Sequence, residues 1–232
     1  METLPNGMTL EIPEGAFPLS TDSMALADFV RLPRTARVLD LGSGCGTLGL
    51  LLCAGDPGCH VTGVEITESA HNAALANISR NALSSRMESV CANLTEVPGL
   101  FPPGSFSVCV SNPPYFSGGP ASKVLAAARK EQLCCAEDLF TAAAHALKFG
   151  GDFFLVHRPE RLAELISLGS LKNLQCKRLR LLRHRQDGPI SLVLLQLRKG
   201  AKPGLVIEET ALRTPDGDFT ADYRRIYHIE EA

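Results

Sequence analysis

Apolar positions along the chain recur with two different spacings. Short apolar runs of strand length alternate with longer stretches in which apolar residues return at helical spacing, from residue 37 to about residue 169. Strands are predicted near 37–41, 60–65, 87–91, 106–111 and 151–157, and helices over 46–54, 67–82, 133–148 and 159–168. Strands that alternate with helices build βαβ units, so we expect an α/β fold with a mostly parallel sheet.

The pattern changes after Gly169. Two strand-like runs, 176–182 and 190–198, are joined by a segment that contains Asp187-Gly188, a turn signal. This predicts an antiparallel hairpin at the C-terminal side of the sheet. Ahead of the first strand, a short amphipathic helix is expected over Met24–Arg31, with Asp22 at or near its N-terminal cap.

Length and cysteine usage narrow the class of protein. A chain of 232 residues suits one substantial domain with small additions. The eight cysteines lie mostly in apolar runs and without metal-ligand spacing, which indicates core residues in a reducing compartment and no metal site. Without a signal sequence or an apolar run of membrane-spanning length, a cytoplasmic protein and no membrane partner are expected. The sequence leaves the oligomeric state open.

The most informative loop follows the first predicted strand and has the sequence Asp40-Leu41-Gly42-Ser43-Gly44-Cys45-Gly46. A dinucleotide fingerprint would have a glycine in place of Thr47, and a phosphate-binding P-loop would have lysine in place of Leu50. The loop instead resembles the first motif of the Rossmann-like S-adenosylmethionine-dependent methyltransferases. That resemblance implies their seven-stranded sheet, with Gly42 and Gly44 passing under the cofactor and Asp40 holding its methionine amino end.

Three further polar residues are candidates for the same cofactor pocket. Glu65 ends the second predicted strand, where an acid accepts bonds from ribose hydroxyls. Asn93 lies where many methyltransferases carry an acid against the adenine amino group, and Asp22 lines the pocket if the N-terminal helix covers it. Each has a structural alternative: Glu65 could be an N-terminal cap or a solvated strand end, and Asn93 and Asp22 could each be a helix cap.

The fourth predicted strand runs into Asn112-Pro113-Pro114-Tyr115. An exocyclic amino group on a planar ring or amide is a poor nucleophile, because its lone pair is delocalised. The Asn112 side-chain oxygen and the Pro113 carbonyl would accept its two N–H groups and direct its lone pair at a methyl donor, while Tyr115 stacks on the ring. The alternative is a rigid turn that closes a buried strand.

Charge is unevenly spread in a chain of net charge −2. Between residues 172 and 202 there are nine basic side chains and one acid, Asp187. Such a stretch suits the phosphates of a nucleic acid, and it equally suits a solvated face. The candidate substrate contacts in it are Lys177, Arg178, Arg180, Arg183 and Arg185.

Over nearly its whole length the chain resembles a narrower family, the bacterial adenine-N6-methyltransferases that act next to the anticodon of a valine tRNA. The resemblance rests on Thr21–Ser23, Asp40–Gly46, Asn112–Phe116, Ala128–Glu131, His157–Leu162, Arg198–Gly204, Gly217–Thr220 and Tyr223–Tyr227. The chain departs from the family at Lys130, where members often have histidine, and at Ile12–Gly15, where a glutamine is common.

That resemblance implies a function and a set of roles. The expected partner is a tRNA anticodon loop and the expected cofactor is S-adenosyl-L-methionine. Asn112, Pro113 and Tyr115 form the expected catalytic set, with Phe116 and Arg129 on the substrate side. The expected organisation is an N-terminal segment over 1–36, a methyltransferase domain over 37–200 and a C-terminal extension over 201–232.

Three other functions remain open on the sequence. A glutamine methyltransferase acting on a release factor shares the Asn-Pro-Pro-Tyr chemistry, but such enzymes usually carry a helical domain ahead of the catalytic one. An rRNA guanine methyltransferase uses a similar motif. A non-catalytic RNA-binding module would keep the fold without the reaction.

Overall fold

The structure is a computed structural model that describes residues 2–4, 7–13, 19–113 and 136–229. The strands are β1 (Glu2–Thr3), β2 (Thr9–Leu10), β3 (Arg37–Leu41), β4 (His60–Glu65), β5 (Met87–Cys91), β6 (Phe106–Ser111), β7 (Leu147–His157), β8 (Leu174–Arg185), β9 (Ile190–Lys199) and β10 (Val206–Arg213). The helices are α1 (Thr21–Phe29), α2 (Thr47–Gly55), α3 (Glu68–Arg80), η1 (Leu94–Glu96), α4 (Val97–Leu100), α6 (Ala136–Ala146), η2 (Pro159–Arg161), α7 (Leu162–Leu171) and α8 (Ala221–Ile226).

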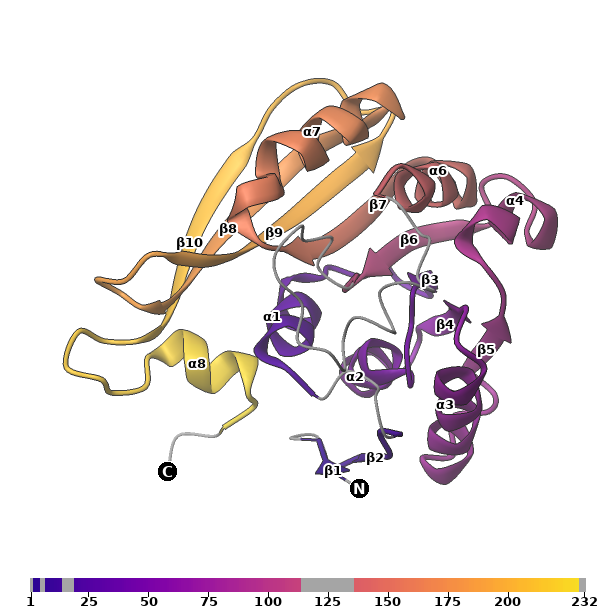
Figure 1. Cartoon of the computed structure of the whole chain (residues 1–232), viewed down its shortest axis with the longest axis horizontal. Helices are drawn as coiled ribbons and strands as arrows, with labels where there is room; N and C mark the ends of the chain where they lie inside the picture. The colour runs from indigo at the N-terminus through magenta and orange to yellow at the C-terminus, as the bar shows by residue number, and fades with distance from the viewer. Residues whose placement is uncertain (1, 5–6, 14–18, 114–135, 230–232) are drawn as a thin grey trace, which may run out of the picture.

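One large sheet organises the molecule (Figure 1). Its strand order is β10-β8-β9-β7-β6-β3-β4-β5, and β9 runs antiparallel to both of its neighbours while the other pairings are parallel. The expected parallel α/β sheet and the antiparallel hairpin of β8 and β9 are therefore confirmed. The expected count of seven strands is wrong, because the sheet has eight.

The additional strand is β10, which pairs in parallel with β8 at the edge of the sheet. Its run Val206-Ile207-Glu208-Glu209 places two charged residues inside an eight-residue strand, and Val206 and Ile207 are exposed. An edge strand has one neighbour, so its sequence carries a weaker apolar signal than an inner strand. The segment after Gly200 thus contributes to the main sheet as well as forming α8.

Strand alternation separates the core into two apolar layers. On β7, Phe154 and Val156 face one layer while Phe153 and Leu155 face the other, as a period of two requires. Helices α1, α2 and α3 cover the first layer, and α6 and α7 cover the second (Figure 1). Among the described residues, no helix is long and apolar enough to cross a membrane.

The sheet reverses its order at β3. The next strands in the chain, β4 and β5, lie on one side of β3, and β6 begins the strands on its other side. In open α/β sheets, ligands bind outside the carboxyl ends of the strands at such a reversal. The candidate residues at the ends of β3, β4 and β6 all lie at this place.

Candidate active site

The glycine loop connects β3 to α2 and consists largely of backbone. Gly42, Gly44 and Gly46 have φ of +77°, +54° and +86°, a region in which an L side chain is strained. A Cβ added at Gly42 or Gly44 would meet no described atom within 4 Å. At Gly42 and Gly44 the loop therefore presents backbone with no other described atom close by, the form expected where a ligand approaches closely.

Close packing beneath the loop uses glycines that the sequence analysis did not single out. A Cβ at Gly63, in β4, would lie 2.6 Å from the Ser43 hydroxyl oxygen, and one at Gly49, in α2, would lie 2.4 Å from the Met87 methyl carbon. These two glycines let the loop and α2 lie directly against β4 and β5. An isolated glycine inside a strand is a known sign of such close approach.

Glu65 joins the loop to the next helix. One carboxylate oxygen accepts the Gly44 N–H at 2.8 Å and the other accepts the Thr67 N–H, also at 2.8 Å. The side chain is buried, so Glu65 is not a solvated strand end. Each oxygen keeps further lone pairs, and the carboxylate lies at the carboxyl end of β4, where ribose hydroxyls are bound in related folds.

Asp40 is an almost fully buried acid under the loop. Its Oδ2 has no hydrogen-bond partner among the described residues, and neither has the Ser43 hydroxyl. Burial, with a smaller contribution from the negative charge of Glu65, raises the pKa of Asp40 to about 7. Buried polar atoms normally have partners, so a cationic ligand group beside Gly42 would complete this site.

Asn112 and Pro113 leave the sheet next to the glycine loop. The Ser111 hydroxyl donates to the Leu41 carbonyl at 2.7 Å, which ties the last residue of β6 to the last residue of β3. Adjacent strands lie about 4.8 Å apart, so Asn112 and Gly42 start their loops side by side. Asn112 is half-buried and donates from Nδ2 to the Ser23 hydroxyl of α1 at 2.9 Å, and Pro113 is buried.

Some predicted site residues lie outside the described part of the chain. They are Pro114, Tyr115, Phe116 and Arg129, together with the departure at Lys130. Of the Asn-Pro-Pro-Tyr motif, the structure therefore describes Asn112 and Pro113.

Asn93 is a helix cap. Its side-chain oxygen accepts the Thr95 N–H at 3.0 Å and the Thr95 hydroxyl at 2.9 Å, while Glu96 accepts the Asn93 N–H, which completes a capping box. The structural alternative raised for this residue is confirmed. Its predicted contact with an adenine ring stays a prediction.

Asp22 lies in the first turn of α1, and Ser20 occupies the cap position. Burial raises the pKa of Asp22, and the positive charges of Arg158 and His184 oppose that rise. The start of α1 therefore has basic neighbours from the ends of β7 and β8. His184 was not singled out from the sequence, because nothing local to residue 184 reveals a neighbour at residue 22.

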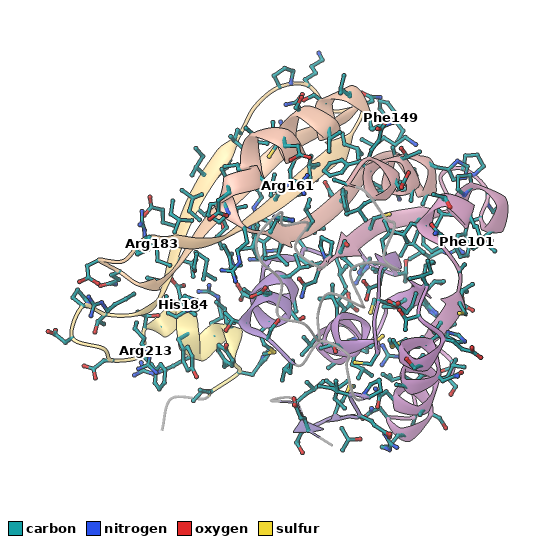
Figure 2. All side chains as sticks on the ribbon, in the orientation of Figure 1. Phe101, Phe149, Arg161, Arg183, His184 and Arg213 are labelled. Carbon is teal, nitrogen blue, oxygen red and sulfur yellow. The ribbon has the colours of Figure 1, made fainter. Side chains whose placement is uncertain are left out.

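The basic side chains of the predicted stretch lie on two opposite sides of the sheet. One is the side where the parallel strands end, called here the carboxyl edge, and the other is the side where they begin, called here the amino edge. Because β8 runs parallel to β6, Arg183 and Arg185 lie at the carboxyl edge, on the same side as Asn112. Figure 2 shows Arg183 and His184 at this end of β8, near Arg213 at the end of β10. Lys177 lies toward the amino edge, where it donates to the Lys202 carbonyl at 3.1 Å.

Arg178 and Arg180 point into the protein. Arg180 is buried and pairs with Asp28 at 2.6 Å and with Glu208 at 3.2 Å, and Arg178 pairs with Glu208 at 2.9 Å. Both guanidinium groups lie over the Phe29 ring. These contacts join α1, β8 and β10 and leave neither cation displayed to a surface ligand. Arg161, in the short helix η2, is also held in an ion pair, with Glu164.

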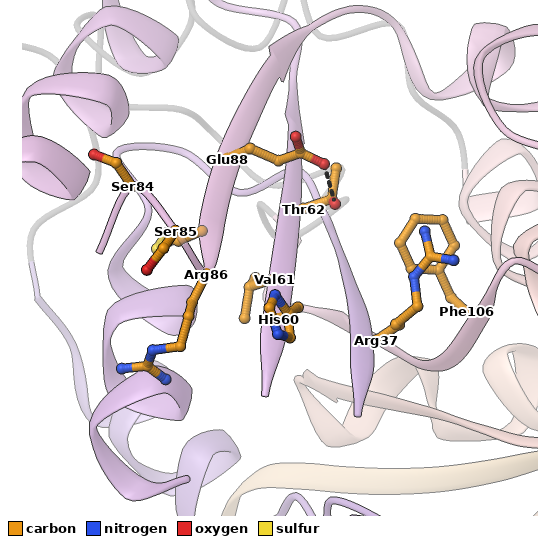
Figure 3. Close-up of a pocket in the computed structure, with 10 residues that line it drawn as sticks. Arg37, His60, Val61, Thr62, Ser84, Ser85, Arg86, Glu88 and Phe106 are labelled. Carbon is orange, nitrogen blue, oxygen red and sulfur yellow. Dashed lines mark hydrogen bonds between the residues drawn. The ribbon is translucent and has the colours of Figure 1, made fainter. Parts of the chain in front are cut away.

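A cavity of about 390 Å³ lies at the opposite, amino end of the sheet. Figure 3 shows it between the starts of β3, β4 and β5, with the Thr62 hydroxyl donating to Glu88 at 2.7 Å. Its lining includes Arg37, His60 and Phe106. None of the predicted site residues lines this cavity. We therefore assign the site to the carboxyl end, where the glycine loop lies and where Asp40 Oδ2 has no partner among the described residues.

Comparisons with known proteins agree with this geometry. The model of the methyltransferase small domain matches residues 19–175. A tRNA1(Val) (adenine(37)-N6)-methyltransferase from Photobacterium profundum is 25% identical over 209 residues, covering 88% of this chain and 87% of the relative.

Solved structures show the same fold. A predicted O-methyltransferase from Agrobacterium tumefaciens superposes with a TM-score of 0.74 and 23% identity, over 89% of this chain and 95% of the other. The geranyl diphosphate C-methyltransferase of Streptomyces coelicolor, crystallised with S-adenosyl-L-homocysteine, superposes with a TM-score of 0.59 at 13% identity, over 76% and 78%.

Proposed function

The chain belongs to the methyltransferase small domain family, and from this premise we propose that it methylates the exocyclic amino nitrogen of adenine in tRNA, next to the anticodon. The methyl donor is S-adenosyl-L-methionine. The observation that carries the proposal is the position of Asn112, which follows the strand tied to the end of β3 and so lies beside the bare glycine loop. The similarity to a tRNA adenine methyltransferase over 209 residues supports the substrate class.

The residues around the loop fit the cofactor. Gly42 and Gly44 leave room for it, the unpartnered Asp40 oxygen suits its ammonium group, and Glu65 suits its ribose hydroxyls. When bound, S-adenosylmethionine supplies an electrophilic methyl group. Asp22 and Asn93 remain proposed neighbours of the pocket, and their structural roles are compatible with that because each keeps a polar group at the carboxyl edge.

Asn112 and Pro113 hold the reacting group of the substrate. With Nδ2 bonded to Ser23, the Asn112 Oδ1 is the end of the carboxamide that accepts a substrate N–H. The Pro113 carbonyl accepts the second N–H, and proline has no N–H of its own to compete. Two acceptors orient the nitrogen lone pair, so positioning contributes more than proton transfer. The proposed stacking of Tyr115 and Phe116, and a contact by Arg129, come from the sequence alone.

The RNA reaches this site along the carboxyl edge. Arg183 and Arg185 lie there with exposed or half-buried side chains, and we assign them to the phosphates. An anticodon loop is single-stranded, so its bases can be turned outward without opening a duplex. In the proposed organisation, residues 37–200 form the methyltransferase domain, 1–36 supply the helix that contacts Asn112, and 201–232 form an extension.

The decisive experiment has two parts. Nucleosides from tRNA of cells with and without the gene are analysed by mass spectrometry, and purified protein is given labelled cofactor with tRNA, with rRNA fragments or with a release factor. N6-methyladenosine that disappears with the gene, together with label on tRNA, is the expected result. Label on a glutamine or on guanine would replace the proposal with one of those activities.

A further inference from the structure

The Asn112 carboxamide has two ends of similar shape and opposite hydrogen-bonding character. Its Nδ2 donates to the Ser23 hydroxyl at 2.9 Å. We propose that Ser23 is a positioning residue, which fixes this carboxamide so that its oxygen, and not its amino group, faces the substrate nitrogen. The inference rests on the proposed function, and it adds a residue that does not itself touch the substrate.

Orientation matters because the substrate amino group brings two N–H donors. If the carboxamide turned over, its NH₂ would face an NH₂, and no hydrogen bond would form. The Ser23 hydroxyl can accept from the carboxamide N–H or donate to the carboxamide oxygen, but only the first arrangement leaves that oxygen for a substrate N–H. With substrate bound, the two hydrogen bonds together therefore hold the carboxamide in the observed orientation. Misplacement of a positioning group by about 1 Å can cost on the order of 100-fold in rate.

Ser23 is well placed to impose this orientation. It is 7% exposed, and the next three residues of α1, Met24, Ala25 and Leu26, are at most 1% exposed. The helix therefore presents its hydroxyl from a packed surface. A side chain fixed by packing holds its partner more accurately than one on a free loop.

The helix is anchored independently of Ser23. Asp28 in α1 pairs with Arg180 at 2.6 Å and with Arg225 at 2.8 Å, and it is 11% exposed as a side chain. Removing one hydroxyl at Ser23 therefore leaves α1 in place. Ser23→Ala is accordingly a test of orientation rather than of folding.

The experiment compares wild type, Ser23→Ala, Ser23→Thr and the control Ser107→Ala. Ser107 lies at the amino end of β6 and bonds to Arg37, so the control loses a serine hydroxyl on the strand that leads to Asn112. Steady-state methylation of tRNA gives kcat and KM, calorimetry gives the Kd for cofactor, and ¹H–¹⁵N spectra report the Asn112 side-chain amide, assigned by its loss in Asn112→Ala.

We expect Ser23→Ala to lower kcat about 30-fold, within the range for a misplaced group, while the Kd for cofactor and the KM for tRNA change less than about threefold. The Asn112 amide signal moves in the same variant. Ser23→Thr keeps the hydroxyl and restores most of the turnover, and Ser107→Ala matches wild type. In an Asn112→Ala background, Ser23→Ala has no further effect on kcat.

Unchanged kcat and an unchanged Asn112 amide signal in Ser23→Ala overturn the inference, and wild-type methylation of tRNA then leaves the proposed function standing. An equal loss of kcat in Ser107→Ala also overturns it, because the effect would be general. If the wild type transfers no methyl group to tRNA, the proposed function fails, and the amide signal alone decides whether Ser23 holds the carboxamide.

Discussion

The stability of the apoprotein is expected to depend on pH through a single side chain, Asp40. In the folded apoprotein its pKa is about 7, whereas an unfolded aspartate titrates near 4. Between these values the folded state binds more protons, so the apoprotein loses stability as the pH rises from about 4 to about 7. Asp40→Asn is expected to remove this loss, which urea unfolding at pH 5 and pH 8 measures.

The same carboxyl group must ionise to pair with the cofactor ammonium. Affinity for S-adenosylmethionine is therefore expected to fall by up to about tenfold per pH unit below about 7. Calorimetry from pH 5.5 to pH 8 in buffers of different ionisation enthalpy measures both the affinity and the released proton. A flat profile in wild type, matching that of Asp40→Asn, would contradict the assignment of Asp40 to the ammonium group.

A substitution at Asn112 is expected to affect methyl transfer without affecting cofactor binding. Its side chain contacts Ser23 and lies beside, not within, the glycine loop. Asn112→Ala is expected to abolish methylation, a loss of at least about 100-fold by analogy with removal of one preorganised polar group, while the Kd for cofactor by calorimetry stays nearly unchanged. Loss of both together would place Asn112 in the cofactor pocket instead.

At the scale of elements, Gly63 sets how closely β4 approaches the glycine loop. An added Cβ would lie 2.6 Å from the Ser43 hydroxyl oxygen and 2.9 Å from the Ser43 Cβ. Gly63→Ala is therefore expected to displace the loop, to weaken cofactor binding, and to cost about 1–3 kcal/mol of unfolding free energy. Cofactor titration and urea unfolding measure the two effects.

The control is Gly55→Ala, at the end of α2, where an added Cβ meets nothing within 4 Å of the described atoms. Alanine also favours a helix over glycine, so this variant should bind cofactor normally and unfold no more easily than wild type. If Gly63→Ala behaved the same way, the loop would be less constrained by β4 than the distances indicate.

Local patterns predicted the strands from β3 to β6 well because their signals are local. The bounds of β3, β4 and β5 match the apolar runs, and the glycine loop follows the strand it was expected to follow. The runs bounded by glycine or by a turn dipeptide were read correctly for the same reason. Bounds shifted where a strand extends beyond its apolar run, as β7 does by starting at Leu147 instead of 151.

Such local patterns do not predict which residues far apart in the sequence come into contact. Ser23 and Asn112 are 89 positions apart, and Arg180 finds Asp28 at a separation of 152 positions. Nothing near Arg180 in the sequence distinguishes it from Arg183, yet one is an internal ion-pair partner and the other lies at the carboxyl edge. Which basic residues are available to RNA is therefore a property of the folded sheet.

For the whole molecule, binding of tRNA is expected to depend steeply on salt, because cations on the protein release counterions from the phosphates. The double variant Arg183→Gln with Arg185→Gln should weaken affinity and reduce the slope of log K against log salt by about 1 to 2. Fluorescence anisotropy with an anticodon stem-loop between 50 and 300 mM salt measures this, within the range where the effect is large.

Lys177→Gln is the matched variant at the amino edge and is expected to change the salt slope less than the carboxyl-edge pair. A larger effect at Lys177 would move the RNA to the opposite edge of the sheet. A slope near zero in wild type would remove the RNA assignment of the basic residues altogether.

The attachment of α1 to Arg225 and Tyr227 has a consequence for biosynthesis. Thr21 meets Tyr227 across 206 positions at 2.8 Å, and Arg225 reaches Asp28 across 197. A ribosome synthesises these partners 197 to 206 residues after the α1 residues that they contact. Nascent chains that already contain the glycine loop and Asn112 therefore lack the contacts that anchor the helix carrying Ser23 until residues 225–227 have been made.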